Sequence, residues 1–134
     1  MIAADTSALV AVVLGEPDAE RFLARLQSDA VSISAVSFTE ALIVIEARQG
    51  PDAGRDLELL VAGVVDRVVA VDEAHARGAA AAWRRFGKGR HPAGLNFGDC
   101  FAYATASLAS LPLLFKGDDF SQTDLQAADH HGPR

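Results

Sequence analysis

The sequence predicts an α/β fold with three α/β/α layers around a central parallel sheet of four to five strands. Short apolar or β-branched runs alternate along the chain with longer segments of helical periodicity. This pattern is typical of parallel strands joined by crossover helices. The 134 residues are 50% hydrophobic and contain no linker or internal repeat. We therefore expect one domain over residues 1–134.

The first half of the chain is expected to contain two strands and three helices. The apolar segments 1–4 and 31–34 are short, as buried strands usually are. Helical periodicity covers residues 7–14, 18–27 and 37–49. Gly15 ends the first of these helices, and Gly50 with Pro51 ends the last, because both residue types commonly follow a helix.

The second half is expected to contain three helices and two strands. Residues 67–71 and 113–115 are the strands, and the helices cover residues 57–64, 73–86 and 100–108. Trp83 and Tyr103 lie in Ala-rich helical segments, so we expect both in the core. A basic, glycine-rich loop covers 87–94. The polar tail over about 121–134 is expected to be partly disordered, with at most one more short strand.

Composition restricts the classes of function. The single Cys100 excludes an internal disulfide and a cysteine zinc site, which favours a reducing, cytoplasmic setting. The apolar run 8–14 is too short to cross a membrane and has no basic region before it. We therefore expect a soluble protein with no membrane association. The net charge of −6 argues against nucleic-acid binding on average.

Four acidic positions are expected at one edge of the sheet. Asp5 follows the first strand, and the adjacent Asp118 and Asp119 follow the last, while Glu40 and Asp99 begin helices. In right-handed crossovers, strand C-termini and helix N-termini share the edge where such sheets bind ligands. Two carboxylates about 4 Å apart repel each other by roughly 4 kcal/mol at an effective dielectric near 20. A divalent metal ion would offset this repulsion.

Helix capping is the alternative interpretation of the same acids. Asp5 and Asp99 each suit a helix N-cap, and Ser37 with Glu40 fits a capping box. Asp118 and Asp119 suit an ordinary turn after Gly117. Independent caps have no reason to be acidic at every position of one edge. The residues alone leave both interpretations open.

Four segments also resemble a known family. Residues 5–9 (Asp-Thr-Ser-Ala-Leu), 37–40 (Ser-Phe-Thr-Glu), 95–100 (Leu-Asn-Phe-Gly-Asp-Cys) and 115–120 (Phe-Lys-Gly-Asp-Asp-Phe) are similar to the PIN-domain fold. More narrowly, they resemble the VapC toxins of VapBC toxin–antitoxin systems, in order and over essentially the whole chain. The resemblance implies an Mg²⁺- or Mn²⁺-dependent endoribonuclease that acts on RNA of the tRNA or rRNA class. It also implies a cognate VapB-type antitoxin and a homodimer.

The resemblance assigns roles to individual residues. It implies that Asp5 and Asp99 are the principal metal ligands and that Glu40 is the third acid. Asp119 is the expected fourth acid, with Asp118 as the alternative. We expect Glu40 and Asp119 to act through water or to position the attacking hydroxide. Two further residues have supporting roles, since Thr6 supports the site and Asn96 orients the loop before Asp99.

Arg85, Lys88 and Arg90 are the candidate RNA-binding residues, because they concentrate positive charge shortly before Asp99. The alternative is a solvated helix end whose cations complement the helix dipole. Two other functions compete with a nuclease. One is a receiver-like, magnesium-binding phosphoacceptor domain, although Asp5 lacks an adjacent acidic partner. The other is a catalytically silent PIN module that binds RNA or protein.

Overall fold

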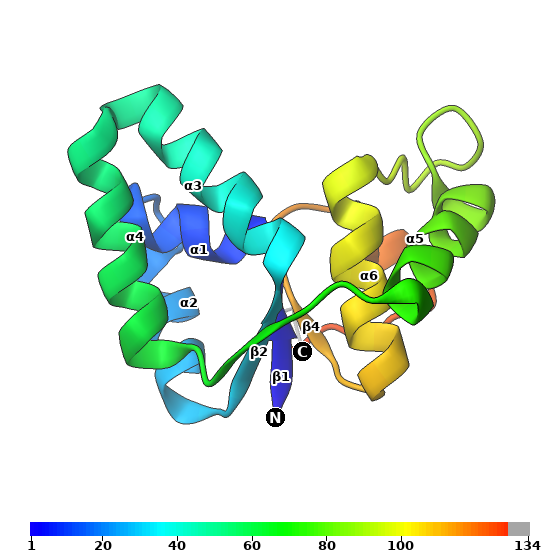
Figure 1. Cartoon of the computed structure of the whole chain (residues 1–134), viewed down its shortest axis with the longest axis horizontal. Helices are drawn as coiled ribbons and strands as arrows, with labels where there is room; N and C mark the ends of the chain where they lie inside the picture. Colours follow the sequence, from blue (N-terminus) through cyan, green and yellow to red (C-terminus); the bar gives the residue numbers. More distant parts are fainter. Residues whose placement is uncertain (129–134) are drawn as a thin grey trace.

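A four-stranded parallel sheet forms the centre of the computed structural model, which describes residues 1–128 (Figure 1). The strand order is β3-β2-β1-β4. Ala3 of β1 is in register with Ser32 of β2 on one side and with Leu113 of β4 on the other. The strands are β1 (Ile2–Ala4), β2 (Val31–Ser34), β3 (Arg67–Val69) and β4 (Leu113–Leu114). An isolated parallel bridge joins Leu113 to Ala127 beyond these strands.

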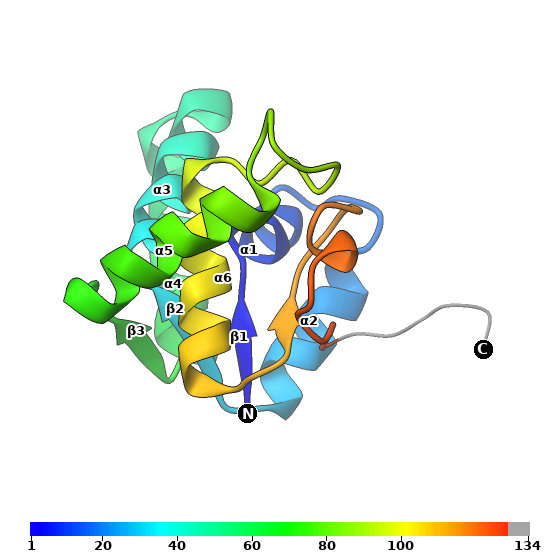
Figure 2. The same ribbon diagram turned by 90° about the vertical axis from the view of Figure 1, so that its right-hand side faces the viewer.

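Helices cover both faces of the sheet, which confirms the predicted three-layer α/β architecture. One face carries α1 (Thr6–Val13), α2 (Ala19–Ser28), α3 (Ala35–Gln49) and α4 (Pro51–Val64), and the other carries α5 (Glu73–Phe86) and α6 (Phe97–Ala109). Figure 2 shows the second of these faces, where α6 runs alongside β1 and α5 crosses in front of α6. Each face has its own core cluster. Ile2 and Ala4 belong to one and Ala3 to the other, as the two-residue period of a strand requires.

Three helix starts differ from the sequence prediction. The helix predicted over residues 57–64 begins at Pro51, because proline is favoured at the first helical position as well as after a helix. Helix α3 begins at Ala35 and is capped by Ser34, so the proposed capping box of Ser37 and Glu40 is wrong. Helix α6 begins at Phe97, three residues earlier than predicted, because Asn96 caps it.

Trp83 is also placed differently from the prediction. Its side chain is 47% exposed, because α5 turns its alanines toward α6 and leaves the indole at the edge of the contact. Tyr103 is buried as predicted, and so is Cys100.

The segment after β4 packs against the domain as far as Ala128. It contains a short 3₁₀ helix, η1 (Phe120–Gln122), and both Phe120 and Ala128 are buried. Arg25 donates a hydrogen bond to the Ala128 carbonyl. The tail predicted over about 121–134 is therefore ordered in its first part, and residues 129–134 lie outside the described range. No helix within residues 1–128 is long and apolar enough to cross a membrane.

Candidate functional site

Asp5 is the most deeply buried acid of the predicted site. It follows β1 and caps α1, and its side chain is 3% exposed. Its Oδ2 accepts hydrogen bonds from the Ser7 amide at 3.0 Å and the Ser7 hydroxyl at 2.6 Å, whereas Oδ1 has no hydrogen-bond partner within residues 1–128. Burial raises the pKa of Asp5 and the Glu40 charge adds to this effect, while the Ser7 hydrogen bonds oppose it. One carboxylate oxygen is thus held by the fold and one is left for a ligand.

Glu40 reaches the same edge from the second turn of α3. The Thr6 hydroxyl donates to Glu40 Oε1 at 2.7 Å and lies 3.1 Å from the Ser37 carbonyl. Helix α6 approaches closely at Gly98. A Cβ atom there would stand 2.6–2.8 Å from the Glu40 carboxylate. The absence of a side chain at position 98 therefore lets the carboxylate lie against α6.

Asp99 lies in the first turn of α6, opposite Asp5 and Glu40. Its amide donates to Asn96 Oδ1 at 2.9 Å, and its Oδ2 accepts from the Asn96 amide at 3.0 Å, which completes a capping box. Burial raises the pKa of Asp99 to about 7, and the negative charges of Asp5, Glu40 and Asp119 contribute to the increase. The four acids therefore interact across the edge of the sheet.

Asp119 and Asp118 face different surroundings. The charge of Asp119 acts on Asp99, and Asp119 stands at the start of η1 without a side-chain capping bond. Asp118 instead lines a separate hollow with Asp18 and Arg21. Of the two, Asp119 is the acid whose charge acts on Asp99, and its role as the fourth acid stays a prediction.

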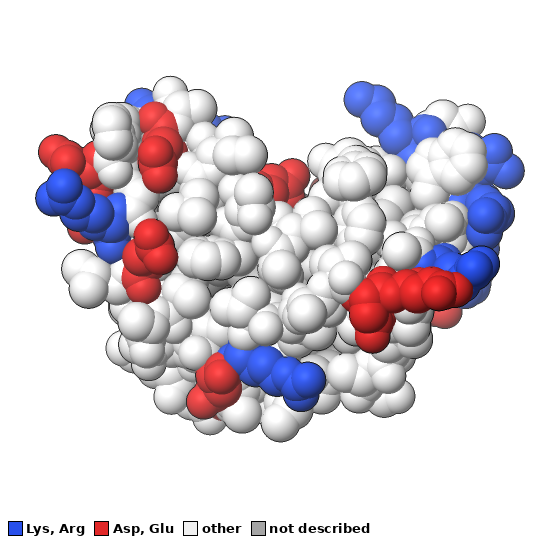
Figure 3. Space-filling view, in the orientation of Figure 1, with Lys and Arg blue, Asp and Glu red and all other residues white. Residues whose placement is uncertain are grey.

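We refer to Asp5, Glu40, Asp99 and Asp119 together as the acidic cleft, because the first three line one cavity and the charge of the fourth acts on Asp99. In Figure 3, acidic side chains lie in the hollow between the side of the molecule formed by α3 and α4 and the side formed by α5 and α6. A cavity of about 340 Å³ is lined by Asp5, Glu40 and Asp99. Arg48 and Lys116 also line it.

The donor set of the acidic cleft suits a hard, hydrated cation. Within residues 1–128, no three His, Cys, Asp or Glu side chains come close enough to ligate one ion together. Magnesium typically uses only one or two carboxylates and keeps several waters. The unpartnered Oδ1 of Asp5 and the raised pKa of Asp99 fit this requirement, because a cation would stabilise both carboxylates in their charged form.

Three functional candidates near the cleft were missed by sequence reasoning. Ser7 joins the two strand ends, since its hydroxyl donates to Asp5 and accepts from the Lys116 amide at 2.9 Å. Gly98 makes room for Glu40. Lys116 lines the cavity while its ammonium pairs with Glu16 at 2.8 Å. The position of Ser7 beside Asp5 was visible in the sequence, but the approach of α6 to α3 was not.

The three predicted RNA-binding cations divide into two groups. Lys88 lines a groove with Asn96, and the Arg90 guanidinium lies 4.6 Å from the centre of the Trp83 ring. Arg85 instead pairs with Asp124 at 3.4 Å and covers Phe86. Lys and Arg side chains gather on the α5 side of the molecule in Figure 3. Lys88 and Arg90 therefore lie by the groove that Asn96 lines, whereas Arg85 forms an ion pair with Asp124.

Comparison with known protein families gives a match over nearly the whole chain. The PIN domain family matches residues 2–125. Ribonuclease VapC30 of Mycobacterium tuberculosis is 51% identical over 122 residues, which cover 90% of this chain and 93% of that protein. Ribonuclease VapC of Mycolicibacterium smegmatis is 50% identical over 124 residues, covering 92% and 96%.

Solved structures share the fold at lower identity. Mycobacterium tuberculosis VapC20, described as a sarcin–ricin loop cleaving toxin, superposes with a TM-score of 0.76 at 21% identity. The match covers 93% of this chain and 96% of that one. A chain of a toxin–antitoxin complex from Klebsiella pneumoniae gives a TM-score of 0.69 at 18% identity, covering 92% and 93%.

Proposed function

The chain belongs to the PIN domain family and, within it, to the VapC ribonucleases, and from this premise we propose that it is a metal-dependent endoribonuclease. Magnesium is the proposed ion, and manganese is the substitute. The observation that supports metal dependence is the buried Asp5, whose Oδ1 has no partner although the charges of other acids act on it and on Asp99.

Each acid of the cleft has its own proposed role in the hydrolysis of RNA. Asp5 and Asp99 would hold the ion, and the Ser7 hydroxyl and the Asn96 backbone amide, which donate to their carboxylates, fix the orientation of these groups. When bound, the ion would polarise the scissile phosphate and lower the pKa of a water molecule. Glu40, oriented by Thr6, would position that water for in-line attack. Asp119 would also act through water. The products would carry a 5′-phosphate and a 3′-hydroxyl.

An Asp99→Asn variant tests this proposal. We expect RNA cleavage in Mg²⁺ to fall by more than about 100-fold, because replacement of groups that merely support metal ligands already costs 10- to 100-fold. Calorimetric titration with Mn²⁺ should show weaker binding. Asp52→Asn is the matched control, since Asp52 is almost fully exposed on α4 and makes the same change of charge. Intact cleavage by a contaminant-free Asp99→Asn preparation would refute the assignment.

A cognate antitoxin of the VapB type is the proposed partner, and the cytoplasm is the proposed compartment. Expression of the chain alone should arrest growth, and co-expression with the antitoxin should restore it. An Asp5→Asn chain should be harmless on its own. Equal toxicity of the two chains would count against a nuclease toxin. The homodimer stays a prediction that the mass of the purified chain in solution would test, and the tRNA or rRNA class of substrate stays a prediction for cleavage-site mapping on total RNA.

The competing functions make different predictions. Family membership gives no support to the receiver-like domain, and a small phosphodonor should leave the chain unlabelled. A catalytically silent PIN module would bind RNA without cutting it. Magnesium-dependent cleavage that is lost in Asp99→Asn would exclude the silent module.

A further inference from the structure

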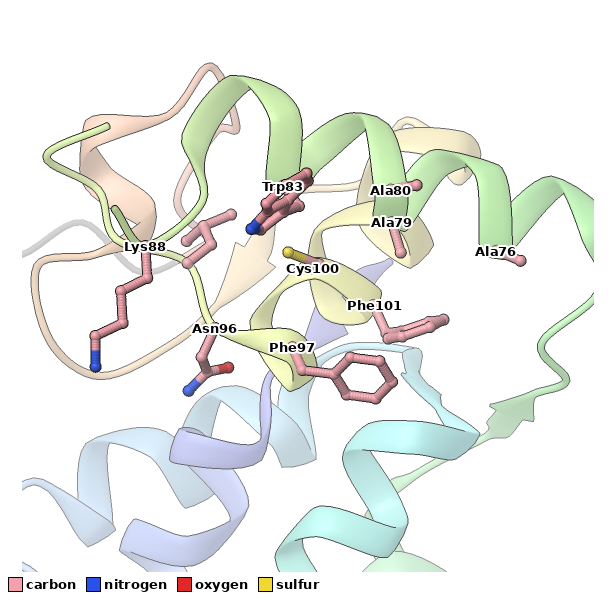
Figure 4. Close-up of a pocket in the computed structure, with 10 residues that line it drawn as sticks. Ala76, Ala79, Ala80, Trp83, Lys88, Asn96, Phe97, Cys100 and Phe101 are labelled. Atoms are coloured by element: carbon pink, nitrogen blue, oxygen red, sulfur yellow. The ribbon is translucent and has the colours of Figure 1, made fainter. Parts of the chain in front are cut away.

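An apolar groove runs between α5 and α6 (Figure 4). Alanines of α5 line one side, Phe97 and Phe101 of α6 line the other, and Trp83 and Lys88 lie toward one end. The groove encloses about 580 Å³, within the range of roughly 300–1,000 Å³ found for small-molecule sites. Trp83 is 47% exposed and Phe97 is 76% exposed. The fold of this chain thus leaves two large aromatic side chains uncovered.

The end of the groove near the loop is cationic, although the whole chain carries a net charge of −6. The Arg90 guanidinium lies 4.6 Å from the centre of the Trp83 ring, and its Nε donates to the Arg84 carbonyl at 3.2 Å. Lys88 lines the groove at this end, with its ammonium extending away from the aromatic rings in Figure 4, and no ion pair occupies that ammonium within the described part of the chain. Positive charge that has no acidic partner among the described residues therefore borders an aromatic surface.

The groove adjoins a second hollow that reaches Glu40 of the acidic cleft. Asn96 and Phe97 line the groove, and they also line this second hollow of about 780 Å³, which contains Glu40 and Gly98. Asn96 caps the helix turn that carries Asp99. A flexible strand with one phosphate at the acids could therefore reach Trp83 along the surface.

We propose that this groove, lined by Trp83, Phe97 and Phe101, binds an unpaired nucleobase of the RNA strand whose scissile phosphate lies in the acidic cleft. This inference rests on the proposed function. Single-stranded RNA is commonly bound by stacking of its bases on aromatic side chains, with cations along the backbone. One RNA strand complements both features, with a base for the rings and phosphates for Lys88 and Arg90. An apolar helix of a protein partner would cover the rings but leave the cations without a counterpart.

Binding to a cleavage-deficient Asp99→Asn chain tests the proposal directly. Trp83 is the sole tryptophan, so its fluorescence reports on the groove. We expect a short single-stranded RNA to quench this fluorescence and to bind more tightly than an abasic backbone of equal length. Adding Phe97→Ala should weaken binding of the base-containing strand by about 5- to 150-fold and leave abasic binding unchanged. Phe97→Tyr should retain the affinity. Leu59→Ala, at a 73% exposed position on α4, should change neither value.

Two outcomes would overturn the nucleobase site. Equal binding of the two strands, with unchanged Trp83 fluorescence, would show that the groove does not contact bases. A change of oligomeric state in Phe97→Ala without loss of base-dependent affinity would assign the groove to a protein interface. Cleavage by the unmodified chain is measured in parallel. Cleavage without base dependence would overturn this site alone, whereas base-dependent binding without any cleavage would overturn the proposed function.

Discussion

Asp5 serves the fold and the site with different oxygens. Oδ2 caps α1 through Ser7, and Oδ1 is buried without a partner. Asp99 likewise closes a capping box with Oδ2, and Thr6 holds Glu40 through Oε1. Helix capping and ligand binding are therefore compatible at these residues, and the sequence alone could not separate them because the residue types suit both.

The pKa of Asp99 predicts a pH dependence of stability in the metal-free protein. Its pKa is raised to about 7 in the folded chain, against about 3.9 for an unperturbed aspartate. Between these values the folded chain binds more protons than the unfolded chain, so stability falls as pH rises. Asp5 contributes in the same direction. Urea unfolding in EDTA should show a midpoint that decreases as pH rises from about 4 to about 7.

Variants and added metal ions identify the group responsible for the fall of stability with pH. Asp99→Asn should flatten it, Asp52→Asn should leave it unchanged, and added Mg²⁺ or Mn²⁺ should stabilise the chain most at the higher pH. A slope that Asp99→Asn leaves intact would contradict the role given to Asp99.

Gly98 predicts a variant that loses activity while keeping its stability. The Cβ of Gly98→Ala would displace the Glu40 carboxylate, which lies at the end of a flexible side chain and can move at little cost to folding. Misplacing a group by about 1 Å can lower a rate roughly 100-fold, so cleavage should fall by about this factor. Gly63→Ala is the control, because nothing lies within 4 Å of its added Cβ. It should raise the stability by up to about 1 kcal/mol with cleavage unchanged. Equal cleavage by the two variants would rule out a role for the Glu40 position.

Local signals predicted most of the elements. All four strands match predicted segments, because their short apolar or β-branched runs are bounded by turn residues. The sequence could not predict that Pro51 begins α4, since a Gly-Pro pair both ends a helix and suits the start of the next. The exposure of Trp83 depends on the packing of α5 against α6. The placement of Asp119, rather than Asp118, where its charge acts on Asp99 depends on how the chain turns after β4. Both are tertiary features without a local signal.

The N-cap of α6 provides a test at the level of the helix. Asn96→Ala removes the capping bond to the Asp99 amide, which should lower the stability by about 1 kcal/mol. It should also lower cleavage by roughly 10- to 100-fold, because the turn that presents Asp99 loosens. Asp72→Ala is the matched control, since Asp72 caps α5 through the His75 amide and belongs to no part of the acidic cleft. Urea unfolding and a cleavage assay would be run on both variants. A similar loss of cleavage in both would mean that general destabilisation is the cause.

The distribution of charge over the whole molecule is compatible with an RNA substrate despite the net charge of −6. The acids of the cleft are gathered where a cation would offset them, and the positive side chains gather on the adjoining α5 side (Figure 3). Average charge therefore underestimates the attraction of phosphates, because binding depends on the local potential.

Salt dependence tests whether this local charge contacts the RNA backbone. For single strands, the slope of log affinity against log salt is about 0.7 per phosphate contact. Lys88→Ala with Arg90→Ala, in the Asp99→Asn chain, should therefore weaken binding and reduce the magnitude of the slope by about 1.4. Arg55→Ala with Arg67→Ala makes the same change of net charge, on α4 and β3, and should leave the slope nearly unchanged. Fluorescence anisotropy of a labelled strand over a series of salt concentrations measures both. If the two double variants lowered the slope equally, net charge alone would govern binding and the loop would have no specific contact with the RNA.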